Sequence, residues 1–143
     1  MTNNALQKGH LRTMTEIDKI RQRFENDRFA TNQTDIKIDE AHENYSKCSF
    51  EIQTHHLNGI DKVMGGAIFT IADFATAVAA NGVDKKSVSL SNTINFLGQP
   101  KGKTVIAEAK IVKSGKTVSV FEVNVYDELN TPVAFVTSTI FNM

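Results

Sequence analysis

The sequence predicts an α+β domain in which an antiparallel sheet of about six strands covers one long, buried central helix. Two observations lead to this fold class. Residues 64–82 form an apolar stretch that opens with Gly65-Gly66 and closes with Asn81-Gly82, as a helix with a clear start and stop does. Six other stretches, two before this helix and four after it, have the alternating apolar and polar pattern of strands.

Length and composition limit the possible functions. The chain has 143 residues, 41% of them hydrophobic, which favours one domain over residues 1–143 with a sizeable core. Residues 1–13 are polar and are expected to be flexible. The formal net charge is zero, so no large positive field exists to neutralise phosphates, and nucleic acid is not an expected partner.

The sequence also indicates a cellular compartment. A single cysteine, Cys48, excludes an internal disulfide, which fits a reducing environment. Residues 1–14 lack the apolar segment of a signal peptide, and no apolar run is long enough to span a membrane. We therefore expect a cytoplasmic protein that does not contact membranes.

The elements before the central helix follow from local patterns. Apolar residues recur at helical spacing from Thr15, the expected N-cap, to about Phe29, which predicts a short amphipathic helix. Residues 34–40 and 45–52 alternate and predict a hairpin of two strands. The loop over residues 53–64 is longer than most connections in compact domains, and such loops are often functional.

The central helix is apolar on every side, which is typical of a buried helix. Its single acid, Asp73, is unusual, because a carboxylate is rarely placed in such surroundings without a partner or a role. A sheet can cover only one side of this helix. A second subunit is the expected cover for the other side, so we expect a homodimer or a homotetramer.

Four further strands are expected after the central helix, over residues 87–97, 104–112, 117–126 and 132–141. Turn-forming residues separate them, notably around Ser114-Gly115 and at residues 127–130. The resulting sheet is largely antiparallel.

A short motif extends this interpretation to function. Asn58 lies six residues before the run Met64–Gly66, and Asp73 lies eight residues after the first glycine of that run. With the order of elements, this motif resembles the PaaI-like acyl-CoA thioesterases of the hotdog fold, in which a sheet wraps one long helix. The family's own motif has an Asn, a His-Gly-Gly sequence and an Asp at similar spacing. The resemblance covers about residues 33–141.

The resemblance implies an enzyme that hydrolyses acyl-CoA thioesters, with Asp73 as general base on water or as nucleophile. Gly65, alone or together with Gly66, would donate a backbone N–H to the thioester carbonyl. The first N–H groups of a helix have no internal partner and carry partial positive charge, so they suit a developing oxyanion. Along one helix, Gly65 and Asp73 would lie about 12 Å apart. The two parts of the site are therefore expected to come from different subunits with antiparallel central helices.

The same resemblance implies supporting residues. Asn58 would hold the water or the thioester, because an amide can donate and accept at once. Ser89 would help to place the water, with Ser91 or Thr76 as alternatives. Met64 departs from the family, which usually has His at this position. That His tends to shape the active-site turn, so the departure bears on substrate class and rate.

Coenzyme A is the expected second half of the substrate. The resemblance implies that its nucleotide binds to a hairpin formed by Lys113, Ser114, Gly115, Lys116, Thr117 and Val118. Lysines and turn N–H groups suit phosphates. Phe96 would line the pantetheine tunnel, and Lys101 and Lys103 are further candidates. No cofactor and no metal ion are expected.

Other interpretations remain or are excluded. The main alternative is a hotdog protein that binds acyl-CoA or an acyl carrier without turnover, which Met64 favours. A dehydratase is disfavoured, because no His lies in the helix motif. A metal site at His55-His56 is rejected, because further ligands at workable spacing are lacking. Cys48 alternates with apolar residues and is expected in the core rather than as a nucleophile.

Overall fold

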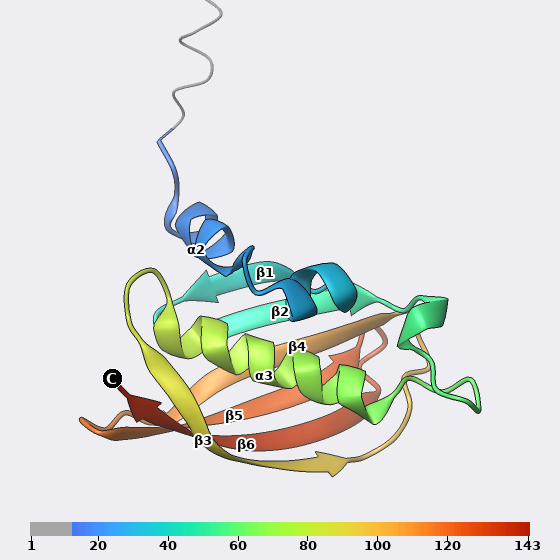
Figure 1. The fold of residues 1–143 in the computed structure, drawn as a ribbon. Helices are drawn as coiled ribbons and strands as arrows, with labels where there is room; N and C mark the ends of the chain where they lie inside the picture. Colours follow the sequence, from blue (N-terminus) through green and yellow to red (C-terminus); the bar gives the residue numbers. More distant parts are fainter. Residues whose placement is uncertain (1–12) are drawn as a thin grey trace, which may run out of the picture.

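The computed structural model of the protein describes residues 13–143 (Figure 1). Except for Thr13, the segment expected to be flexible lies outside these residues. In the described part, one six-stranded antiparallel sheet wraps around the central helix α3 (Gly65–Asn81), which confirms the predicted hotdog architecture. Within residues 13–143, no helix combines the length and apolar character that crossing a membrane would require.

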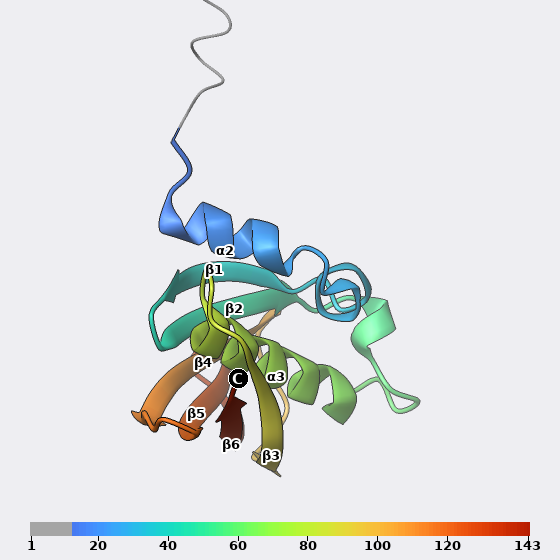
Figure 2. The same ribbon diagram turned by 60° about the vertical axis from the view of Figure 1, so that its left-hand side comes forward.

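The first described helix, α2 (Glu16–Phe24), begins at the predicted N-cap. The Asp18 N–H donates to the Thr15 hydroxyl, and the Thr15 N–H donates to the Asp18 carboxylate, which forms a reciprocal capping box. The helix ends at Phe24, earlier than predicted, and the Asp27 N–H donates to the Phe24 carbonyl at 3.0 Å in the turn that follows. A separate π-helical turn, η1 (Phe29–Gln33), follows. Figure 2 shows α2 lying along β1 at one edge of the sheet.

The strands agree closely with the predicted ranges. They are β1 (Lys37–His42), β2 (Tyr45–Glu51), β3 (Ser87–Phe96), β4 (Thr104–Lys113), β5 (Val118–Asp127) and β6 (Pro132–Asn142). Their order in the sheet is β1-β2-β4-β5-β6-β3, so β1 and β3 form the two edges. The start of β1 was predicted three residues too early. Asp35 has a φ of 60°, and the Ile36 N–H donates to the Ala30 carbonyl instead of a strand.

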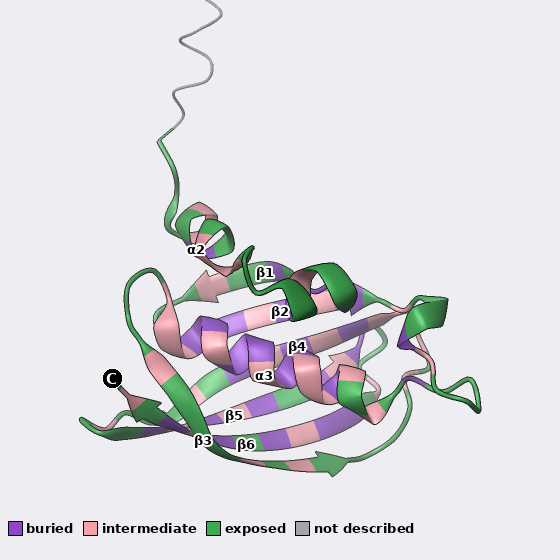
Figure 3. Cartoon of the chain, in the orientation of Figure 1, coloured by how far each residue is buried: buried purple, intermediate pink, exposed green. Residues whose placement is uncertain are grey.

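The core lies between the concave face of the sheet and α3. Ile68, Ile71 and Val78 of the helix are buried there, and Cys48 of β2 is fully buried as predicted. Figure 3 shows the buried segments, in purple, along α3 and the strands. Burial raises the pKa of the Cys48 thiol to about 12, so it stays protonated and unreactive at neutral pH. The helix is not buried on every side, however. Its Asp73 side remains half-buried, because the sheet covers only the opposite side.

The edge strand β3 is exposed along most of its length. It pairs with β6 on one side, and no other strand of the described residues pairs with its second side. Val88 and Leu90 on this strand are 50% and 58% exposed. An unpaired edge that carries exposed apolar side chains is a ready surface for another chain.

Candidate active site

The start of α3 leaves two backbone donors open. Met64 is the N-cap and makes no side-chain capping bond. Its carbonyl already accepts from the Ala67 and Ile68 N–H groups, at 3.0 and 3.2 Å. Among the described residues, the N–H groups of Gly65 and Gly66 have no hydrogen-bond partner. These two donors, at the positive end of the helix, can bind an anionic oxygen.

A pocket of about 390 Å³ opens at this helix start. Its lining residues are Asn58, Val63, Gly65, Ile68, Phe96, Leu97, Gly98 and Gln99. The Phe96 ring covers Gly65 so closely that a Cβ atom at this position would lie 3.2 Å from Cζ of Phe96. The structure therefore brings three predicted site residues together: Asn58, Gly65 and Phe96.

Asn58 occupies the pocket with only half of its amide available. Its Oδ1 accepts from the Ile60 N–H at 3.0 Å and from the Lys62 N–H at 3.1 Å. These bonds shape the loop as an Asx turn. Its NH2 group has no hydrogen-bond partner among the described residues. Asn58 can therefore donate to a ligand, but its oxygen is not free for the accepting role that was predicted as well.

Asp73 lies in the middle of α3, half-buried. Burial raises the pKa of its carboxyl group, and the nearby Asp27 carboxylate raises this pKa further. The Ser89 hydroxyl opposes both effects through a hydrogen bond that lowers the pKa. The net result is a raised pKa, which suits a carboxylate that takes up a proton during a reaction.

The structure distinguishes Ser89 from its two predicted alternatives. Thr76 is buried within the core and donates its hydroxyl to the Ala72 carbonyl at 2.9 Å. A bulge in β3 separates Ser89 from Ser91. Ser89 stands opposite the buried Ile140, on the concave face, whereas Ser91 stands opposite Thr139. Of the three hydroxyls, only that of Ser89 acts on the pKa of Asp73.

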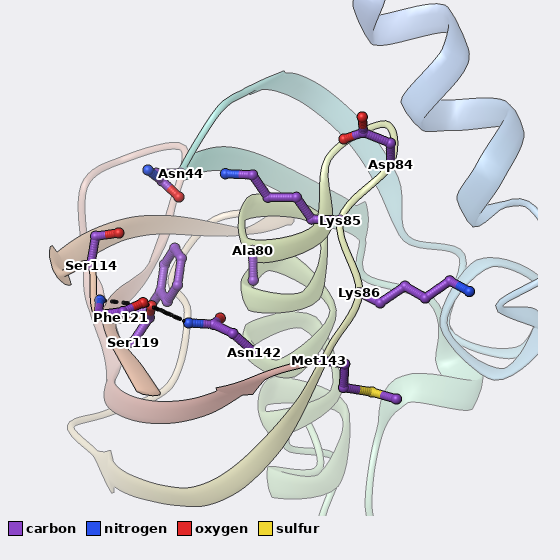
Figure 4. Close-up of a pocket in the computed structure, with 11 residues that line it drawn as sticks. Asn44, Ala80, Asp84, Lys85, Lys86, Ser114, Ser119, Phe121, Asn142 and Met143 are labelled. Carbon is purple, nitrogen blue, oxygen red and sulfur yellow. Dashed lines mark hydrogen bonds between the residues drawn. The ribbon is translucent and has the colours of Figure 1, made fainter. Parts of the chain in front are cut away.

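The predicted coenzyme A hairpin lies at the other end of α3. Ser114 and Gly115 line a second pocket, of about 420 Å³, together with Lys85 and Lys86 from the loop after α3 (Figure 4). Asn142 holds this turn, because its Nδ2 donates to the Gly115 carbonyl at 2.9 Å. The side chains of the remaining hairpin residues are exposed: Lys113, Lys116, Thr117 and Val118.

The two pockets share no lining residue. The 17 residues of α3 between them correspond to a length of about 25 Å. One chain therefore does not bring the hairpin to the Phe96 pocket. Lys101 and Lys103 are exposed, and their backbone N–H groups bind the carboxylates of Asp127 and Glu128.

The adjacent histidines have a third neighbour that the sequence spacing did not reveal. Asp35 Oδ2 lies 2.7 Å from His55 Nε2 and 3.6 Å from His56 Nε2. Both ring nitrogens of His56 are already used, however. Nδ1 accepts from the Gln53 N–H, so the proton is on Nε2, which donates to the Thr34 carbonyl. A metal ion at this cluster would have only two side chains, Asp35 and His55, as ligands.

Gln99 is a site residue that sequence reasoning missed. Its pattern predicted only a turn after β3, yet its side chain binds the backbone of Val63 at the active-site loop. The two residues are 36 positions apart, and no local sequence signal indicates such a contact.

Comparisons with known proteins agree with this arrangement. Residues 62–134 match the family model of the thioesterase superfamily, a range that contains α3, β3, β4 and β5. The acyl-coenzyme A thioesterase PaaI of Escherichia coli is 30% identical over 100 residues, covering 69% of this chain and 71% of that protein.

Solved structures also match. The PaaI protein of Escherichia coli superposes with a TM-score of 0.82 at 24% identity, covering 90% of this chain and 93% of that one. A Streptococcus mutans protein bound to acetyl CoA superposes with a TM-score of 0.71 at 26% identity, covering 76% and 88% of the two chains.

Proposed function

Since the chain belongs to the thioesterase superfamily, as a PaaI-like hotdog thioester hydrolase, we propose that it hydrolyses acyl-CoA thioesters to a free acid and CoA. The relative named as an acyl-CoA thioesterase and the neighbour bound to acetyl CoA support this substrate class. One observation carries the proposal. A half-buried carboxyl group with a raised pKa, Asp73, lies on a helix whose first two N–H groups are open.

The proposed site is shared between two copies of the chain. Asp73 lies eight residues beyond Gly65 on the same helix, about 12 Å away, which is too far for both to act on one thioester. The unpaired edge of β3 and its exposed apolar side chains favour a second copy at this edge. With the two central helices antiparallel, Asp73 of one copy would face Gly65 of the other.

In the proposed mechanism, the thioester carbonyl accepts hydrogen bonds from the Gly65 and Gly66 N–H groups. The Asp73 carboxylate takes a proton from a water molecule, and the water oxygen attacks the carbonyl carbon. The negative charge that develops on the carbonyl oxygen is stabilised by the two N–H donors. Collapse of this intermediate breaks the C–S bond, and the thiolate of CoA leaves and takes up the proton.

Other residues that line the two pockets would bind the substrate and orient the water. The free NH2 group of Asn58 would donate to the thioester group, and Ser89 would orient the water beside Asp73. Phe96 would line the path of the pantetheine arm. The hairpin with Lys113 and Lys116 would bind the phosphates of the nucleotide.

A second candidate is a protein that binds acyl-CoA without turnover. Met64 favours it, because this residue takes the place of the family's usual His and provides no capping bond at the helix start. The release of free CoA from acyl-CoA distinguishes the two candidate functions.

The test incubates the purified protein with short aliphatic, long aliphatic and aromatic acyl-CoAs, and a thiol reagent reports free CoA. Asp73→Asn is expected to lower kcat/KM about 100-fold or more. Asp39→Asn, which removes an exposed acid from β1, serves as the matched control and is expected to keep full activity. CoA binding without turnover in every form would support the second candidate, and neither binding nor turnover would refute both.

A further inference from the structure

The side chain of Gln99 pairs with the backbone of the active-site loop. Its Oε1 accepts from the Val63 N–H at 2.9 Å, and its Nε2 donates to the Val63 carbonyl at 3.3 Å. The amide thus binds Val63 as a neighbouring strand would bind it. Gln99 lies in the loop between β3 and β4, and it lines the same pocket as Asn58 and Gly65.

A second anchor holds the next residue from within the loop. The Met64 N–H donates to the His56 carbonyl at 2.9 Å. His56 is itself buried and fixed, because its ring binds the Gln53 N–H and the Thr34 carbonyl, both at 2.9 Å. Val63 and Met64 are therefore held by one contact from another loop and one from the buried histidine.

These contacts account for every backbone polar group just before the helix. Gln99 uses the N–H and the carbonyl of Val63, His56 uses the Met64 N–H, and the first turn of α3 uses the Met64 carbonyl. The next two N–H groups along the chain, of Gly65 and Gly66, have no hydrogen-bond partner among the described residues. The direction in which the two glycine N–H groups point therefore depends on the orientation of Val63 and Met64.

We propose that Gln99 is a positioning residue for the oxyanion site, because it fixes the backbone from which the Gly65 and Gly66 N–H groups project. This inference rests on the proposed thioester hydrolysis. Gln99 does not touch the reacting atoms in this role. It acts through Val63, and it determines where the carbonyl oxygen of the substrate is bound.

A role of Gln99 in positioning differs from a role in folding in what the loss of its amide should change. Gln99 is exposed, but its two bonds reach the buried Val63, so their loss should lower the free energy of unfolding to some extent without unfolding the protein. The rate of an enzyme is far more sensitive, because donors displaced by about 1 Å can lower it about 100-fold. Loss of the Gln99 amide should therefore slow turnover while the protein remains folded.

The first test replaces the amide with an apolar side chain of similar size. Gln99→Leu is expected to lower kcat about 10-fold or more, with KM for acyl-CoA nearly unchanged and the protein still folded at the assay temperature. Amide exchange at Val63 should become faster in this variant, because its N–H loses its acceptor. Gln33→Leu, which replaces an exposed glutamine of η1, is the matched control and should change neither kcat nor this exchange.

A second variant separates the donor from the acceptor. In Gln99→Glu, an ionised carboxylate still accepts from the Val63 N–H but has no proton to donate to the Val63 carbonyl. Protonation restores a donor, so the activity of this variant relative to wild type should rise as the pH falls. A role in stability alone would not give this pattern at temperatures far below the unfolding midpoint.

The outcomes are distinguishable. An active wild type whose kcat is unchanged in Gln99→Leu, or falls only with the folded fraction, overturns the inference. Unchanged exchange at Val63 overturns it as well. A wild type that hydrolyses no thioester refutes the proposed function itself, and the inference with it.

Discussion

Ser89 on the edge strand lies beside the carboxyl group of Asp73 on the central helix and lowers its pKa, while burial and the Asp27 carboxylate raise it more strongly. The base strength of Asp73 is therefore set by three elements: the helix on which it lies, the strand next to it and the segment after α2. This balance determines the pH range in which the proposed site can work.

The pH dependence of turnover should report this balance. General-base catalysis needs the ionised form of Asp73, so the rate should fall on the acid side at a pH above the usual carboxyl range of about 4. Ser89→Ala should move this fall to higher pH, and Asp27→Asn should move it to lower pH. A profile of kcat/KM against pH for the three proteins measures both shifts, and no shift in either variant would contradict this role of the neighbours.

Asp73→Asn should make the protein more stable at neutral pH while it lowers kcat/KM about 100-fold or more. The pKa of Asp73 is higher in the folded state than in the unfolded state, so folding disfavours the ionised form. This cost is fully present above the folded-state pKa and disappears as the pH falls through it. The midpoint of thermal unfolding should rise by about 2 °C or more at pH 7 and approach that of wild type in acid. A lower midpoint at pH 7 would show that the carboxylate stabilises the fold.

The hairpin lysines should contribute to binding rather than to chemistry. Lys113→Ala with Lys116→Ala should raise KM for acyl-CoA about 10-fold and leave kcat nearly unchanged, because phosphate contacts are present in the ground state and the transition state alike. A short thioester without the nucleotide should react equally well in both proteins. Lys37→Ala, on β1, is the control for a general loss of positive charge. An equal effect on both substrates would exclude a nucleotide site at the hairpin.

The β3 edge should be required for both assembly and activity. Leu90→Glu places a charge on the exposed apolar edge, so the protein should elute as a folded monomer that lacks turnover. Light scattering after size exclusion gives the mass, and circular dichroism checks the fold.

A shared site also predicts complementation. When inactive Asp73→Asn and inactive Gly65→Val chains are mixed and reassembled, each mixed dimer contains one intact site, and activity should return.

Asp127 should stabilise the end of the sheet. This buried carboxylate accepts N–H bonds from Lys101 and Gly102 on one side and from Leu129 and Thr131 on the other. These bonds hold its pKa well below the usual range, so its stabilising contribution is present above the unfolded-state pKa and is lost as the pH falls toward the folded-state value. Asp127→Asn should lower the unfolding midpoint by about 5 °C at pH 7. Glu122→Gln, on the same strand, should leave it nearly unchanged.

The sequence was sufficient for features that depend on local pattern. The ends of α3, the N-cap at Thr15 and the alternation of β4 and β5 each follow from neighbouring residues, and the structure confirms them. The spacing of the glycine pair and Asp73 likewise led to the family and to the question of a second subunit.

Two of the missed features depend on contacts between distant segments, and a third on the local geometry of a loop. Gln99 binds a residue 36 positions earlier, and Asp35, which has a positive φ just before β1, contacts His55, 20 positions later. The accepting half of Asn58 is occupied by its own loop, which depends on the geometry of residues 60–62 rather than on their identity. Such contacts leave no periodic pattern in the chain.

The active-site turn is anchored through main-chain atoms. Gln99 and His56 bind only main-chain atoms of Val63 and Met64, and the side chain of Met64 is 55% exposed and makes no capping bond. The turn therefore does not depend on which side chain follows Val63. A substitution at position 64 should therefore leave these main-chain contacts in place.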